Sequence, residues 1–87
     1  MRALKWPVPV DNDHHPVGTG PILAVGTQGG DPSIVYVWTA EIDESHPARR
    51  VRAYGTGWDI PNGHEHIGSV VADPYVWHLY SAPWWES

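Results

Sequence analysis

Cations, aromatic rings and flexible backbone gather in the second half of this chain. Arg50, Arg52 and Tyr54 alternate along one stretch, and Thr56 follows between two glycines. Arginine pairs with phosphate through two parallel N–H groups, and backbone N–H groups in a tight turn point at anions. Aromatic rings stack on nucleobases at about 1–3 kcal/mol per base. This spacing indicates a binding site for a planar, charged small molecule.

The candidate site combines this segment with side chains from the C-terminal end. We expect the arginines to pair with phosphate, the aromatic rings to stack on a base, and threonine and histidine to form hydrogen bonds. The expected ligand-binding residues are Arg50, Arg52, Tyr54, Thr56, Trp58, His66, Trp77 and His78.

A structural role is the alternative for each of these residues taken alone. Tyr54 and Trp77 would then be core side chains, and the glycines beside Thr56 would only turn the chain. The arginines would lie on a solvated edge strand and balance Asp43 and Glu44, where surface ion pairs contribute little.

The sequence lacks the residue sets that catalysis requires. It contains no cysteine, no Gly-x-Ser-x-Gly elbow and no paired carboxylates on an expected rigid wall. No complete set of nucleophile, base and oxyanion donors is visible. We therefore expect a protein that is not an enzyme and that needs no cofactor.

Six histidines raise the question of a metal site. His14 and His15 follow acidic residues, and His64 and His66 flank Glu65. Zinc needs three or four convergent ligands, and the helical His-Glu-x-x-His motif is absent. We expect His64 and His66 to be polar residues beside a turn and expect no bound metal. A metal site built from the four histidines is the alternative.

Charge and hydropathy exclude several classes of partner. The net charge is −5, with ten acidic and five basic residues, which disfavours DNA binding because phosphate neutralisation needs a basic face. No run of about 18 apolar residues predicts a membrane helix. The N-terminus also lacks the apolar stretch of a signal peptide, so we expect the protein to remain in the cytoplasm where it is made.

Nine glycines and nine prolines interrupt the chain and favour short strands over helices. We predict an all-β domain, a small barrel or sandwich of about six antiparallel strands. The expected strands are 3–8, 22–27, 34–41, 49–55, 67–72 and 75–81. The prolines at 7 and 9 place the first strand at a sheet edge.

Two further expectations concern organisation. The strand 34–41 is apolar on both alternating faces, so it is central or lies in an oligomer interface. A chain of 87 residues has a thin core, and we expect a homo-oligomer. We expect one domain over 1–87, with 82–87 as a short extension that carries Trp84 and Trp85, and a mobile loop over 42–48.

Several segments together resemble a family of small, uncharacterised tailed-phage proteins of actinobacteriophages. These segments are Lys5-Trp6-x-Val8-Pro9-Val10, Gly20-Pro21-Ile22-Leu23, Val37-Trp38, Arg52-x-Tyr54-Gly55-Thr56-Gly57, Ile60-Pro61, His66-Ile67-Gly68 and Val76-Trp77-His78-Leu79-Tyr80. The resemblance implies a phage origin, a location in the host cytoplasm and a compact β fold. It implies no catalytic activity.

A phage origin favours functions that depend on binding. The preferred function is capture of a nucleotide-derived immune signal, so that a host defence effector is not activated. The alternatives are a phage protein that inhibits a host protein, such as a defence protein, by direct contact, and a minor virion or assembly protein. A tryptophan-rich C-terminus suits direct contact because tryptophan is enriched at interface hot spots.

Overall fold

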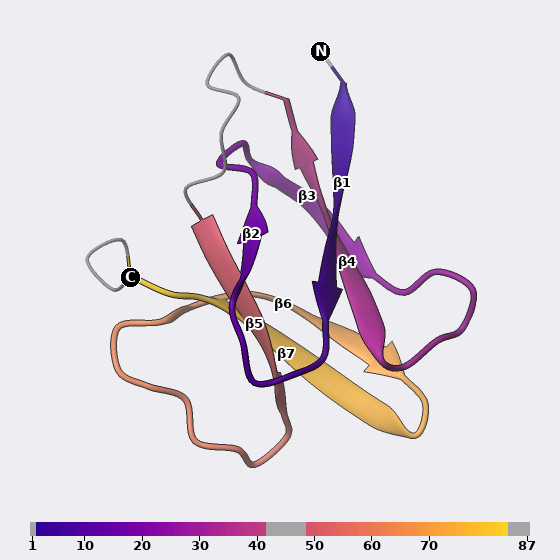
Figure 1. The fold of residues 1–87 in the computed structure, drawn as a ribbon, viewed down its shortest axis with the longest axis vertical. Coiled ribbons are helices and arrows are strands. Elements are labelled where there is room, and N and C mark those ends of the chain that lie inside the picture. Colours follow the sequence, from indigo (N-terminus) through magenta and orange to yellow (C-terminus); the bar gives the residue numbers. More distant parts are fainter. Residues whose placement is uncertain (1, 42–48, 84–87) are drawn as a thin grey trace.

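The chain forms strands and no helix over residues 2–41 and 49–83, which are the residues that the computed structural model describes (Figure 1). The seven strands in these residues are β1 (Ala3–Pro9), β2 (His15–Val17), β3 (Ile22–Gly26), β4 (Ile34–Ala40), β5 (Arg49–Gly55), β6 (Glu65–Ala72) and β7 (Tyr75–Ser81). They form two antiparallel sheets, with strand orders β1-β4-β3 and β2-β5-β7-β6. The described residues contain no helix that could cross a membrane.

One set of apolar side chains fills the space between the sheets. Val8, Val35 and Val37 come from the first sheet, and Val51 and Leu79 come from the second; all are fully buried. Burying such a side chain stabilises a fold by about 1.5–3 kcal/mol. The all-β prediction is confirmed, and the two sheets pack on each other rather than closing into a barrel.

The predicted strands are present, and the structure adds one more. The bounds of β5 and β7 are as predicted, and the β6–β7 hairpin turns at Asp73-Pro74. The strand that was not predicted is β2, which has three residues and contains Pro16. Sequence patterns miss such a strand because it is too short to alternate and because proline argues against a strand.

Strand positions in the first sheet follow the prolines and the valines. β1 is an edge strand, as Pro7 and Pro9 predicted, since an edge position tolerates residues that cannot donate to a neighbour. β4 is the central strand between β1 and β3, and its Val35 and Val37 are fully buried. The prediction of a central strand at 34–41 is confirmed.

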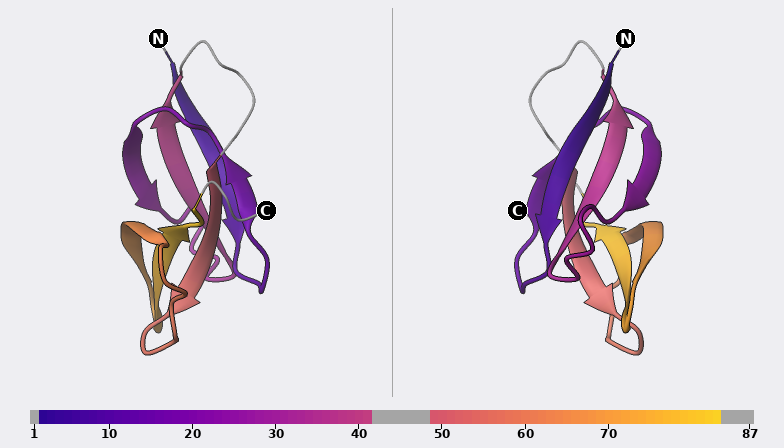
Figure 2. Two further views of the ribbon diagram at one scale, coloured as in Figure 1. Left: turned by 90° about the vertical axis from the view of Figure 1, so that its left-hand side faces the viewer. Right: turned by 90° about the vertical axis from the view of Figure 1, so that its right-hand side faces the viewer.

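A long return loop follows β5. β5 and β6 both pair antiparallel with β7, so they run parallel and residues 56–64 must return along the sheet (Figure 1, lower left). Trp58 in this loop packs against Trp77, and the ring of His64 lies 5.7 Å from that of His14. Figure 2 shows this loop and the β6–β7 hairpin at the end of the molecule opposite the N-terminus.

The loop 42–48, with Asp43 and Glu44, and the tail 84–87, with Trp84 and Trp85, lie outside the described residues. The last described residues pack on the fold, where Ala82 N donates to Arg50 O at 2.9 Å and Pro83 is buried.

Candidate functional site

Polar side chains form a continuous hydrogen-bonded row on the outer face of the second sheet. Thr56 Oγ1 lies 2.9 Å from His78 Nε2. Ser69 Oγ lies 2.8 Å from the other ring nitrogen of His78 and 2.9 Å from His66 Nε2. We call Thr56, His78, Ser69 and His66 the polar row. It joins the loop after β5 to both strands of the closing hairpin.

An irregularity in β6 makes this row possible. His66 pairs with Tyr80 and Gly68 pairs with Leu79, so β6 advances two residues where β7 advances one. Residues three apart on a regular strand point to opposite faces. The extra residue of the bulge reverses this alternation and places His66 and Ser69 on the same face.

Aromatic rings extend the polar row toward β5. The ring centroids of His66 and Tyr80 are 5.2 Å apart, and those of Tyr80 and Tyr54 are 5.8 Å apart in an edge-to-face arrangement. The guanidinium of Arg52 lies 4.6 Å from the centre of the Tyr54 ring. The outer face therefore carries connected rings, hydroxyls and a cation.

Two polar atoms in this region have no hydrogen-bond partner among the described residues. They are the hydroxyl of Tyr54, a residue that is only 2% exposed, and Nε of Arg52. Arg52 makes a long contact of 3.5 Å through its terminal nitrogen to Asn12 Oδ1. A buried donor or acceptor without a partner costs about 1–3 kcal/mol, so these two atoms are the energetically unfavourable positions of this region.

The structure brings together most of the predicted site residues and separates two of them. Arg50 and Arg52 alternate with the fully buried Val51 and lie on the outer face of β5, as predicted. Trp77 points to the opposite face from its neighbour His78: it is 9% exposed, and its indole N–H donates to Pro32 O at 3.0 Å. Trp58 lies with Trp77, at a centroid distance of 6.0 Å.

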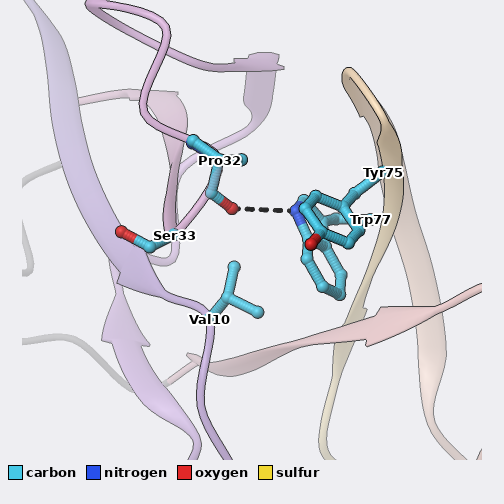
Figure 3. A pocket seen from close by; sticks show the side chains of 5 residues that line it. All are labelled: Val10, Pro32, Ser33, Tyr75 and Trp77. Atoms are coloured by element: carbon cyan, nitrogen blue, oxygen red, sulfur yellow. Dashed lines mark hydrogen bonds between the residues drawn. The ribbon is translucent and has the colours of Figure 1, made fainter.

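Trp58 and Trp77 instead belong to two open grooves at the tip of the hairpin. One groove, of about 360 Å³, is lined by Gly55, Thr56, Trp58, Pro74, Tyr75, Val76 and Trp77. The other, of about 350 Å³, is lined by Val10, Pro32, Ser33, Tyr75 and Trp77 (Figure 3). The stacked rings of Tyr75 and Trp77, 5.3 Å apart, are common to both.

The histidines are distributed over several places on the fold. His14 contacts His64, His66 contacts His78, and His15 lies 2.9 Å from Asp11. In residues 2–41 and 49–83, no group of three or more histidine, aspartate or glutamate side chains could hold a metal ion. The hydrogen bond with the His15 ring lowers the pKa of Asp11, and the backbone N–H of Asp13 lowers it further.

A family model described as Domain of unknown function (DUF7352) matches residues 1–85. The chain belongs to this family. The matched range includes the polar row, the rings beside it and both grooves, so these features lie within the family's domain. Neither a curated protein nor a solved structure matches the chain.

Two residues of the outer face were not predicted from the sequence. Ser69 connects the two histidines of the polar row, and Tyr80 connects their rings to Tyr54. Simple alternation along β6 places Ser69 on the face opposite His66, so the pattern hides the contact. Gly68 is the available signal, because a glycine inside a strand often marks a bulge.

Proposed function

We propose that this protein binds a phosphate-bearing, nucleotide-derived molecule on the outer face of its second sheet and holds it without converting it. The main support is the arrangement of one sheet face. It holds, side by side, the guanidinium of Arg52, the rings of Tyr80 and His66, and the hydroxyls of the polar row. The protein would thereby keep an immune signal from a host defence effector. This context, with a phage origin and a host-cytoplasmic location, rests on the family resemblance of the sequence.

The chemistry of the outer face suits the phosphate. Arginine is the side chain best matched to phosphate, and the guanidinium of Arg52 lies over the Tyr54 ring with a long contact of 3.5 Å to Asn12. Ser69 and His66 are exposed, so they can exchange bonds within the row for bonds to phosphate oxygens.

The base would stack on the rings beside the row. Tyr80 lies on the inner strand β7 and pairs with His66 on the edge strand β6, and rings on a sheet face can bind planar bases without a deep cavity. Trp58 and Trp77, which were expected to stack on the base, have no part in this site because they lie at the hairpin tip.

Scanning fluorimetry against cyclic dinucleotides, ADP-ribose derivatives, mononucleotides and divalent metals tests the proposal. A hundredfold excess over Kd stabilises the folded state by about 2.7 kcal/mol, which raises the melting temperature of a small domain measurably. We expect a shift with one nucleotide class. Mass spectrometry of the heat-released ligand should then return it intact.

Arg52→Ala should abolish the shift, and Arg2→Ala is its matched control because Arg2 pairs with Glu41 beside the ends of β1 and β4 of the other sheet. A shift that persists in Arg52→Ala would remove this arginine from the site. No shift with any nucleotide, or recovery of a cleaved product, would contradict the proposed function.

A further inference from the structure

The two grooves at the hairpin tip expose unusually large apolar side chains. Trp58 and Tyr75 are 49% and 50% exposed, and Val71 and Val76 on the same hairpin are 75% and 37% exposed. Large exposed apolar side chains that cluster around grooves mark interaction surfaces on small proteins. The Trp77 ring lies on the face of β7 opposite the polar row, since Trp77 and His78 point to opposite faces, whereas Val71 and Val76 continue the outer face beyond Ser69 and His78.

The shape of the surface matches an extended, proline-rich segment. Two grooves of nearly equal size, about 350 and 360 Å³, share the Tyr75 and Trp77 rings in their linings. A polyproline helix repeats every three residues at about 3.1 Å per residue and docks its ridges between aromatic rings. Successive ridges of such a helix would occupy successive grooves.

The indole groups supply the hydrogen-bond chemistry. Trp77 already donates its N–H to the carbonyl of Pro32, so an indole–carbonyl contact beside a proline exists inside the fold (Figure 3). Trp58 Nε1 has no hydrogen bond within the described residues, and the ring is half exposed. This indole packs beside Gly55 in the lining of the larger groove, and its N–H can donate to a docked segment because a polyproline helix leaves its carbonyls unpaired.

The charges around the grooves specify the rest of the partner. Asp31 and Asp73 are exposed and directly precede the groove residues Pro32 and Pro74, and the exposed Asp59 directly follows the groove residue Trp58. Asp31 is held at the groove edge by Ser33, whose backbone N–H and hydroxyl donate to it at 2.9 and 2.6 Å. We propose that the hairpin tip binds a proline-rich segment that carries arginine or lysine beside its prolines.

Fluorescence anisotropy with a labelled polyproline peptide that carries an arginine at each end tests this proposal. We expect saturable binding that weakens with added salt and that is lost when glycine and serine replace the prolines. Replacing the arginines by glutamates should weaken it about tenfold or more. Tyr75→Ala should also weaken binding about tenfold, as truncation of an interface aromatic does.

Leu23→Ala is the matched control, because Leu23 is a comparably exposed apolar residue, at 55%, on β3 of the other sheet. Trp58→Ala and Asp59→Asn provide second variants if Tyr75→Ala does not fold. Equal binding of the glycine–serine peptide, or equal effects of Tyr75→Ala and Leu23→Ala, would overturn the proposal. So would a dimer in sedimentation that Tyr75→Ala dissociates while no peptide binds, because the surface would then hold a second copy of this chain.

Discussion

The polar row and the hairpin-tip grooves contrast in chemistry although one strand supplies both. His78 and Tyr80 of β7 face the outer side with Ser69, His66 and Arg52, where hydrogen bonds and cations prevail. The grooves take their stacked ring pair from the same strand, but aromatic surface and neighbouring carboxylates prevail there. The alternation of a single strand thus separates a polar surface that carries an arginine from an apolar, acid-edged one.

The contrast shows that neighbours in the sequence can belong to different sites. Trp77 and His78 are consecutive, yet one donates to a carbonyl of the other sheet and the other joins the polar row. Thr56 is the one residue named in both sets, since it bonds His78 and lines the larger groove. The two surfaces therefore adjoin at the start of the return loop.

The largest expected effect comes from removing the support that both surfaces share. Leu79 is fully buried on β7, and Leu79→Ala should lower the free energy of unfolding by about 2–5 kcal/mol. The free energy of unfolding of a domain is about 5–15 kcal/mol in total, so this loss should impair binding at both surfaces together. Urea denaturation measures the loss. A decrease in the free energy of unfolding of less than about 0.5 kcal/mol would show that the two surfaces do not depend on this shared core.

A glycine substitution should break the polar row and leave the grooves intact. A Cβ on Gly68 would lie 2.7 Å from Val25 Cγ2, and overpacking of this kind costs about 1–3 kcal/mol. Gly68→Ala should shift β6 at its bulge and disturb the His66 and His78 resonances in NMR spectra. The indole N–H resonance of Trp77 should stay in place. Equal changes in the histidine resonances and in the Trp77 indole resonance would mean that the polar row and the grooves cannot be perturbed independently.

One serine in each region allows a matched comparison. Ser69→Ala removes the link between His66 and His78, while Ser33→Ala removes a donor to Asp31 at the groove edge. Each lost hydrogen bond should cost about 0.5–1.5 kcal/mol, so Ser69→Ala, which loses two, should destabilise the fold more than Ser33→Ala, which loses one. In NMR spectra, the ring resonances of both His66 and His78 should move only in Ser69→Ala. The same change in Ser33→Ala would contradict the separation.

The smallest effect concerns acid stability at the grooves. Hydrogen bonds from the Ser33 hydroxyl and backbone N–H lower the pKa of Asp31. A lowered pKa means that this stabilisation is complete above the ordinary value of about 3.9 and is lost as the pH falls through the folded-state value. Asp31→Asn should therefore flatten the fall in melting temperature between about pH 5 and pH 2. An unchanged acid profile would contradict the assignment.

Much of the fold follows from local patterns in the sequence. Prolines at 7 and 9 predicted the edge strand, a two-sided apolar run predicted the central strand, and β5 and β7 have the predicted bounds. β2 was not predictable because its three residues, with Pro16 among them, form a strand only beside β5. Whether such a short segment forms a strand depends on its pairing partner in the folded protein.

The candidate site was predicted in composition but not in arrangement. Arg52, Tyr54, Thr56, His66 and His78 do converge on one region, whereas Trp58 and Trp77 leave it for the hairpin tip. Two features caused the difference. The bulge in β6 places Ser69 on the outer face, where simple alternation would not place it. The alternation of β7 directs Trp77 to the face opposite His78, away from the candidate site. Neither the presence of a bulge nor the face that a strand buries can be read from residue types alone.

The polar row has a consequence for the direction of its protons. With neutral histidines, Thr56 can donate to His78, His78 to Ser69 and Ser69 to His66, or every hydrogen bond can run the other way. Both directions leave all the bonds in the row made. In the first, Thr56 presents an acceptor and the far nitrogen of His66 a donor; in the second, these roles are exchanged. The row is thus a reversible dipole, and a ligand can set its polarity without moving a heavy atom.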